Sequence, residues 1–320
     1  MASSAAALVV GLAMLVAGAE LVVRQGTALA ARFGVSPLVV GMTVVSLGTS
    51  LPELAIGINA AHQGNPGLAV GNIVGTNLVN VLLILGLSAL MRPVTFEPRT
   101  LRFDLPVMAG AAVLLLLLAL DGTLTTADGV VLCAYGAVYL ALVITHSRRE
   151  AKRTSAPAAV TEHARSRPAA VQALLLVVGL AVIVVGAEFL VDGAVSVARA
   201  WGASDTLIGL TVVAIGTSAP ELVTTIVSTL RGSDRSLALG NLLGSSVFNI
   251  ALILGPTVLA APGTVPVPDD VLALDLVLMV ATTLVCLPAF FTRRRLGRWE
   301  GAAFVATYAL YTIWLLTTRL

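Results

Sequence analysis

The sequence predicts an all-α membrane protein with about ten transmembrane helices, arranged as two inverted five-helix repeats. Three features lead to this prediction: the composition, the length of the apolar runs, and two motifs that each occur twice. Hydrophobic residues make up 58% of the 320 residues and charged residues only 11%, whereas soluble domains average roughly 45–50% apolar residues. Several uncharged runs exceed the ~18 residues that a spanning helix needs, and barrel strands would instead be short and alternating.

The apolar runs predict ten spanning segments, at residues 5–23, 37–61, 68–91, 104–120, 127–146, 171–191, 205–230, 237–260, 270–291 and 300–318. No basic region precedes the first of them, so it is predicted to be a helix rather than a cleaved signal. A polar stretch rich in Ala, Ser, Thr and Pro separates five segments from five. We therefore expect a first five-helix repeat at 1–146, a linker at 147–170 and a second five-helix repeat at 171–320.

The two halves share two motifs in the same order. A 13-residue stretch at 41–53 returns at 209–221 with nine identical positions, including Gly-Thr-Ser-x-Pro-Glu. A 16-residue stretch at 71–86, beginning Gly-Asn-x-x-Gly, returns at 240–255 with eight identical positions. Because each half has an odd number of spans, the second copy enters the membrane from the opposite side. Such inverted repeats are typical of secondary transporters, whose site lies near the midplane between the repeats.

Lys and Arg lie almost entirely on one side of this predicted topology. Of the 19, 17 fall in the links after the first, third, fifth, seventh and ninth segments, and by the positive-inside rule those links are cytoplasmic. We therefore expect a multi-pass protein of the cell membrane, in contact with the lipid bilayer, with a cytoplasmic linker and both termini outside. The net charge of only +2 suggests no nucleic-acid partner, and no obligate protein partner is evident.

One carboxylate stands in each copy of the first motif. Glu53 is the only charged residue between Arg32 and Arg92, and Glu221 is the only one between Asp205 and Arg231. A lone charge in a membrane helix is expensive, so each glutamate is a functional-site hypothesis.

A proline precedes each of these glutamates. Pro52 and Pro220 have no N–H, so they should free the carbonyls of Gly48 and Gly216, and these glycines should ease local unwinding of the helix. A simple proline kink is the alternative interpretation.

Oxygen-bearing side chains recur at helical spacing around these carboxylates. Thr49 and Thr217 each lie four residues before a glutamate, and the second motif adds two further pairs, Thr76 with Asn80 and Ser245 with Asn249. The glycines of that motif are expected to allow close helix approach. The set contains no thiolate and no imidazole, so it suits a hard cation such as Ca²⁺ or Na⁺. Helix–helix hydrogen bonding is the alternative role for Asn80 and Asn249, and it is the favoured role for Asn72 and Asn241.

Charge balance suggests how such a site would work. Two buried carboxylates are costly when bare, and one divalent cation, two monovalent cations or two protons would neutralise them. If the site can switch between the two sides of the membrane only when cations neutralise its carboxylates, it must carry one kind of cation out and another in. The sequence therefore predicts antiport. Glu20 lies four residues before Arg24 and is expected to have a structural role.

The paired motifs resemble the two alpha repeats of the sodium/calcium exchanger family, within the calcium/cation antiporter superfamily and of the prokaryotic type. The resemblance implies ten helices, with the first and sixth sliding past the other eight. It implies that Glu53 and Glu221 bind Ca²⁺ and share Na⁺ sites, and that Thr49 and Thr217 contribute backbone carbonyls. It places Asn80 in the central cluster and assigns four hydroxyls to the Na⁺ positions, those of Ser50, Ser218, Thr76 and Ser245.

Two departures from the family pattern matter. Position 249 is Asn where some relatives have Asp, so potassium co-transport is not expected. The linker is too short for the regulatory domain of animal exchangers, so regulation by Ca²⁺ is not expected.

The resulting functional prediction is Na⁺/Ca²⁺ antiport that exports Ca²⁺, with the transported ions bound at the site and no cofactor. One alternative is an H⁺/Ca²⁺ or Mn²⁺ antiporter that uses the same site, and another is a passive cation channel, which would need no counter-ion. An enzyme is not expected, because the sequence has no His-Glu-x-x-His, no Gly-x-Ser-x-Gly and no aspartate dyad.

Overall fold

The structure is a computed structural model that describes residues 2–62, 67–153, 168–200, 214–231 and 235–318. Within these residues, eight helices are long and apolar enough to cross a membrane, and the apolar stretch Val271–Val285 is shorter. The predicted all-helical membrane fold is confirmed. The predicted segment 205–230 begins outside the described residues, and its described part forms two helices, α12 (Ala214–Thr217) and α13 (Ala219–Arg231).

The chain folds into two compact units, and each unit combines parts of both sequence halves. Unit 1 comprises Met1–Thr49, Val143–Leu242 and Thr307–Leu320, and unit 2 comprises Ser50–Leu142 and Leu243–Ala306. The elements of unit 1 are α1 (Ala2–Phe33), α2 (Pro37–Val40), η1 (Gly41–Val45, a π-helix), α3 (Ser46–Thr49), α10 (Ala169–Ala200), α12, α13, the first part of α14 (Arg235–Phe248) and the ends of α8 (Thr126–Arg153) and α17 (Arg298–Thr318).

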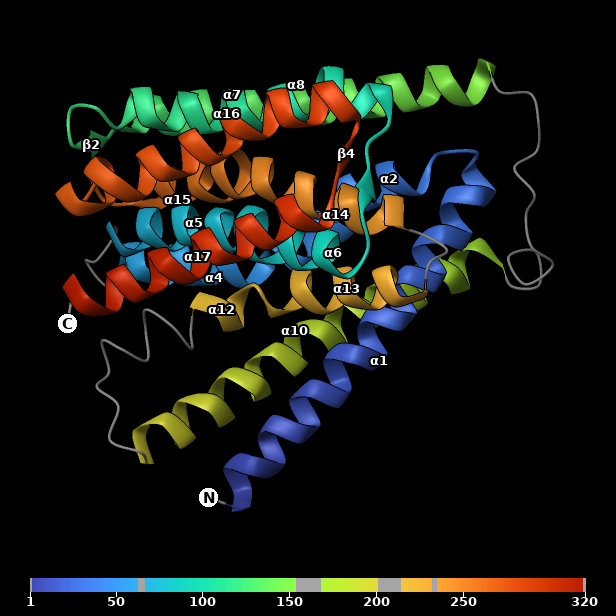
Figure 1. Cartoon of the computed structure of the whole chain (residues 1–320), viewed down its shortest axis with the longest axis horizontal. Helices are drawn as coiled ribbons and strands as arrows, with labels where there is room; N and C mark the ends of the chain where they lie inside the picture. The colour runs from blue at the N-terminus through green and yellow to red at the C-terminus, as the bar shows by residue number, and fades with distance from the viewer. Residues whose placement is uncertain (1, 63–66, 154–167, 201–213, 232–234, 319–320) are drawn as a thin grey trace. The chain divides into compact units, whose positions relative to one another are not determined.

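The two longest helices of unit 1, α1 and α10, lie side by side (Figure 1). They run antiparallel, because Gly11 faces Gly186 while Gly18 faces Gly179. A Cβ atom at Gly11 would lie 2.7 Å from the carbonyl oxygen of Gly186, so the backbones touch where these glycines meet. Since α1 and α10 begin corresponding halves of the chain, their antiparallel course agrees with an inverted repeat.

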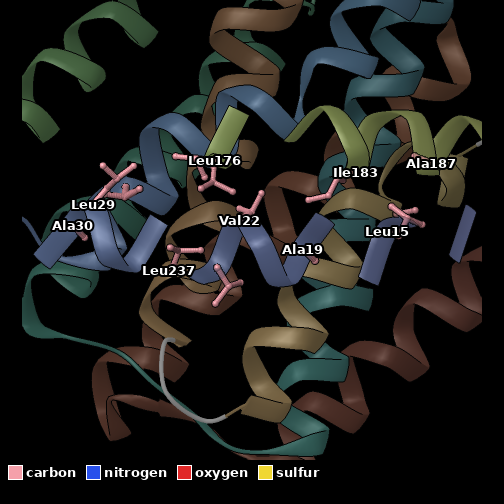
Figure 2. Packing of buried hydrophobic residues seen from close by; sticks show 13 residues of the cluster. Leu15, Ala19, Val22, Leu29, Ala30, Leu176, Ile183, Ala187 and Leu237 are labelled. Carbon is pink, nitrogen blue, oxygen red and sulfur yellow. The ribbon is translucent and has the colours of Figure 1, made fainter. Parts of the chain in front are cut away.

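Apolar side chains fill the rest of this contact, as Figure 2 shows. Leu15, Ala19 and Val22 of α1 are fully buried and belong to one cluster with Ile183 of α10 and Leu237 of α14. We call the whole set the α1 cluster: Leu15, Ala19, Val22, Val23, Leu29, Ala30, Val40, Val45, Leu176, Ile183, Ala187, Ala219 and Leu237.

Both long helices extend well beyond their predicted ends. The sequence predicted 5–23 and 171–191, whereas α1 continues to Phe33 and α10 to Ala200. Glu20 and Arg24 lie within α1, where Arg24 Nη2 and Glu20 Oε1 form an ion pair of 2.8 Å. Their spacing of four residues predicted this contact. The chain leaves the helix at Gly34, which adopts a positive φ of 66° that favours glycine.

Unit 2 holds the elements between these parts of the chain. They are α4 (Leu51–His62), α5 (Gly67–Leu78), η2 (Val79–Leu85), α6 (Gly86–Met91), β1 (Val94–Thr95), η3 (Thr100–Asp104), α7 (Leu105–Leu118), β2 (Thr123–Leu124), most of α8, the end of α14, η5 (Asn249–Leu254), α15 (Gly255–Ala260), β3 (Val265–Pro266), η6 (Val271–Asp275), α16 (Leu276–Arg293), β4 (Arg295–Leu296) and the start of α17. The segments labelled η are π-helices.

The short strands of unit 2 pair in a pattern that reflects the repeat. Strand β1 pairs antiparallel with β4, and β2 pairs antiparallel with β3. In the sequence alignment of the halves, β1 corresponds to β3 and β2 to β4. Exchanging the halves therefore turns one sheet into the other, as a two-fold relation between the repeats requires.

The beginning of the predicted linker is helical, because α8 continues to Arg153. Residues 154–167, which form most of the predicted linker, lie outside the described residues.

Candidate cation-binding site

Both copies of the first motif contain a helix interruption at the same position. In the first copy α3 ends at Thr49, Ser50 is a turn and α4 begins at Leu51. In the second copy α12 ends at Thr217, Ser218 is a turn and α13 begins at Ala219. Proline is tolerated in the first turn of a helix, where its missing N–H has no intrahelical role. The predicted local interruption is therefore confirmed.

The glycines of this motif stay helical, and the interruption lies two residues beyond each of them. Gly48 lies in α3 and Gly216 in α12, two residues before each interruption. A Cβ atom at Gly48 would lie 2.6 Å from Leu180, and one at Gly216 would lie 2.2 Å from Val191. Both glycines therefore leave room for side chains of α10, and the change of direction falls on the serines.

Each glutamate occupies the first turn of the helix that follows its interruption. Glu53 of α4 and Glu221 of α13 are both fully buried, with 0% exposure. The N-terminal turn of a helix favours negative charge, because its free N–H groups and the helix dipole point toward that end. The fold thus positions two carboxylates in equivalent local surroundings, one in each unit.

Unit 1 holds Glu221 together with Thr49, Thr217 and Ser218, which are all buried. A hydrogen bond in this unit connects the two motifs, since Thr49 Oγ1 donates to Asn241 Oδ1 at 3.2 Å. The same hydroxyl lies 3.3 Å from the carbonyl oxygen of Ser46. Asn241, for which the sequence favoured a structural role, therefore anchors the last residue before the interruption.

The predicted close helix approach occurs at Gly240. A Cβ atom there would lie 2.1 Å from the carbonyl oxygen of Leu38, so α14 and α2 touch through their backbones. The prediction is wrong for Gly75, where an added Cβ would meet nothing within 4 Å.

Unit 2 holds Glu53, Ser50, Thr76, Asn80, Ser245 and Asn249, each at most 2% exposed. Ser50 lies in the turn before α4, and the other five residues come from α4, α5, η2, α14 and η5. The elements α4, α5 and η5 all pack against one another. Asn80 lies at the start of η2 and Asn249 opens η5. Such π-helical turns inside α-helices occur frequently at functional sites.

Some buried polar side chains of unit 2 make no hydrogen bond within the described part of the chain, and five of them belong to the repeated motifs: Ser50, Thr76, Asn77, Asn80 and Asn249. Buried polar groups are normally hydrogen-bonded, so a group of such residues requires an explanation such as a bound ion or water. Four of the five were predicted as ligands. The sequence interpretation missed Asn77, although its position directly after Thr76 and opposite Ser246 in the repeat could have indicated it.

Two further buried carboxylates were also missed. Asp104 is 0% exposed and Asp275 is 5% exposed, and they end the π-helices η3 and η6. They occupy equivalent places in the two halves. Neither aspartate lies in one of the two repeated motifs, and the sequence interpretation assigned no role to either.

The bond between Thr49 and Asn241 makes a testable contribution to stability. Thr49→Val keeps the shape of the side chain but leaves Asn241 Oδ1 buried without its donor, which costs about 1–3 kcal/mol. We expect the thermal unfolding midpoint of the purified protein to fall by several degrees. Thr49→Ser keeps the hydroxyl and is expected to stay closer to the wild type, and equal loss in both variants would contradict the assignment.

Comparison with known proteins gives a consistent result. A family model described as "Sodium/calcium exchanger protein" matches residues 3–145 and 171–317. The chain is 34% identical to the putative antiporter CaxA of Alkalimonas amylolytica over 94% of this chain and 95% of that protein. It is 32% identical to the sodium/calcium exchanger MaX1 of Methanosarcina acetivorans, over 96% of each chain.

Solved structures agree with the sequence relatives. The sodium-calcium exchanger NCX_Mj, soaked with 2.5 mM Na⁺ and 0.1 mM Ca²⁺, matches with a TM-score of 0.82 at 30% identity, over 98% of each chain. A second structure of NCX_Mj, soaked with 2.5 mM Na⁺ and 10 mM Sr²⁺, matches with the same TM-score.

Proposed function

Because the chain belongs to the sodium/calcium exchanger family, we propose that it exports Ca²⁺ across the cell membrane in exchange for Na⁺. The observation that carries this proposal is the equivalent placement of Glu53 and Glu221. Both are fully buried, and each follows a helix interruption in its copy of one motif. Two buried negative charges require compensating cations, since isolated charges in low dielectric are very unfavourable.

We assign the cation ligands to these glutamates and to oxygen-bearing residues of the two repeated motifs. Glu53 and Glu221 supply the negative charge, and the backbones around Gly48 and Gly216 supply carbonyl oxygens. The remaining ligands are hydroxyls and amides, from Thr49, Thr217, Ser50, Ser218, Thr76, Ser245, Asn80 and Asn249. Carboxylate, hydroxyl and carbonyl oxygens are preferred by hard cations. The names of MaX1 and NCX_Mj, both sodium/calcium exchangers, support Na⁺ and Ca²⁺ as the pair of ions.

Exchange follows from the charge of this ligand set. One Ca²⁺ or two Na⁺ neutralise the two carboxylates equally, so either load allows the site to change its facing. An empty site retains two buried negative charges and is held in place by their desolvation cost. In this proposal residues 1–146 and 171–320 act as the two repeats, the linker is cytoplasmic, and both termini lie outside.

The test is ⁴⁵Ca²⁺ uptake into proteoliposomes loaded with Na⁺, compared with liposomes under a pH gradient alone and with liposomes without a gradient. We expect rapid uptake only when Na⁺ can leave. Uptake that needs only the pH gradient would replace Na⁺ by H⁺ as the coupling ion. Uptake without any counter-ion would identify a channel and would overturn antiport.

A further inference from the structure

The helix that begins with Glu221 carries hydroxyl groups along one buried face. After Glu221, the buried residues of α13 are Thr224, Thr225, Ser228 and Thr229, with exposed fractions of 0%, 4%, 0% and 5%. They follow Glu221 by three, four, seven and eight residues, which places all five on one face of an α-helix. We call these four residues the α13 hydroxyl face.

The apolar residues of α13 cover a different surface. Ala219 belongs to the α1 cluster, and Val223 and Val227 pack against that cluster. Leu230 is 70% exposed. The hydroxyl face is therefore more deeply buried than Val223, Val227 and Leu230, so it faces the protein interior rather than membrane lipid.

Two of these hydroxyls differ from several other helical threonines in the protein. Thr27, Thr257 and Thr283 each donate to the carbonyl of the residue four positions earlier, at 2.8, 2.8 and 3.0 Å. Thr224 and Thr225 make no hydrogen bond within the described residues, although both are buried, with exposed fractions of 0% and 4%. A buried hydroxyl without a partner is unfavourable, so both groups are available to water or to a cation.

The fold itself does not require hydroxyls at these positions. The equivalent residues of α4 in the first repeat are Ile56, Gly57, Ala60 and Ala61, which carry no polar atom in their side chains. The hydroxyl face therefore belongs to the second repeat alone. Under the proposed topology the chain beyond α13 is cytoplasmic, so this face leads from Glu221 toward the cytoplasm.

We propose that the α13 hydroxyl face binds partly hydrated Na⁺ or Ca²⁺ on its way between Glu221 and the cytoplasm. This proposal rests on the proposed cation exchange. Thr224 and Thr225 lie one turn beyond Glu221 and replace water ligands of the arriving ion, and Ser228 and Thr229 do so one turn further out. Because hydroxyls are uncharged, they hold a cation too weakly to trap it, as conduction along a path requires.

The first test is chemical access to single cysteines, which does not depend on transport. In a Cys133→Ala, Cys286→Ala background, Thr225→Cys and Ser228→Cys are treated in inverted vesicles with a membrane-impermeant cationic methanethiosulfonate. We expect both to react and Ca²⁺ or Na⁺ to slow the reaction. Val227→Cys is the matched control, because it lies beside Ser228 but faces the α1 cluster, and it is expected to stay unmodified. Equal reactivity at all three positions would overturn the proposal.

The second test measures transport, so it also applies if the protein adopts a conformation in which the reagent cannot reach the hydroxyl face. Thr224→Val with Thr225→Val removes both hydroxyls without changing side-chain shape. We expect kcat/KM for a given ion to fall about tenfold from both sides, because ion–hydroxyl contacts are charge-assisted and the ion crosses the same path in either direction. Thr283→Val is the control, since the Thr283 hydroxyl bonds within its own helix.

The outcomes separate this inference from the proposed function. Wild-type protein that fails to exchange Na⁺ for Ca²⁺ would end the proposed function, whereas cysteine access would still report on the path. Normal wild-type exchange with no change on either side in the double valine variant, and unreactive cysteines at 225 and 228, would refute the hydroxyl path alone.

Discussion

Replacing Glu53 with glutamine is expected to abolish Na⁺-driven ⁴⁵Ca²⁺ uptake into proteoliposomes. The side chain is fully buried, and glutamine keeps its shape while removing its charge. At an effective dielectric of ~20, a unit charge ~4 Å from a cation contributes several kcal/mol. Loss of that charge corresponds to a fall in Ca²⁺ affinity of about a thousandfold or more. Glu221→Gln should behave in the same way, because Glu221 occupies the equivalent position in the second motif.

A binding measurement separates lost ligation from misfolding in these variants. Ca²⁺ at about 100 times its Kd should stabilise the wild-type protein by about 2.7 kcal/mol, and this stabilisation should disappear in Glu53→Gln. Without cations, Glu53→Gln should be at least as stable as the wild type, because one fewer charge is buried.

Glu20→Gln provides the matched control for these charge changes. Glu20 forms an ion pair with Arg24 on α1, and both side chains are partly exposed, so its removal should cost little. Uptake and Ca²⁺ binding should stay near the wild type. If Glu53→Gln took up ⁴⁵Ca²⁺ as fast as the wild type, the assignment of Glu53 as a cation ligand would be wrong.

Gly240→Ala is expected to produce one of the largest losses of stability among single substitutions in the motifs. The added methyl group would lie 2.1 Å from the carbonyl oxygen of Leu38. This neighbour is backbone within α2, so it cannot swing aside as a side chain would. Overpacking of this kind typically costs about 1–3 kcal/mol and sometimes more, and we expect the upper end or beyond. The measurement is the thermal unfolding midpoint of the purified protein, together with the yield of folded protein.

The other repeat supplies the control for this clash. Gly71 occupies the same motif position, but a Cβ atom there would meet only Val271 at an ordinary 3.8 Å. Gly71→Ala should therefore be neutral, or slightly stabilising in a helix because alanine has the higher helix propensity. Equal losses in Gly71→Ala and Gly240→Ala would show that the motif requires glycine for backbone conformation rather than for helix contact.

Much of the candidate site could be predicted because it depends on local sequence. The repeated motif with a lone carboxylate identified Glu53 and Glu221, and Pro52 and Pro220 predicted an interruption in each copy. The precise residue of the interruption was not predictable. Gly48 and Gly216 have the greater conformational freedom, yet both stay helical and leave room for side chains of α10.

The missed residues share a physical cause. Asp104 stands at the start of a predicted spanning segment and Asp275 lies inside one, and neither falls in a repeated motif that would mark a site. The hydroxyls of Thr224 and Thr225 carry no charge, so a hydropathy pattern does not distinguish them from threonines that bond within their helix. Burial and hydrogen-bond partners depend on which other segments pack nearby.

The sequence by itself determined that this chain is a helical membrane protein with an inverted repeat, and it identified the two glutamates that carry the charge. These properties follow from apolar length, from repeated motifs and from the cost of charge in a membrane, and each can be seen along the chain. Only the tertiary structure decided which segments share a compact unit, where α1 and α10 end, and that Asn241 accepts the Thr49 hydrogen bond. Those properties depend on contacts between residues about 200 positions apart, such as Leu38 with Gly240, which no local pattern of residues specifies.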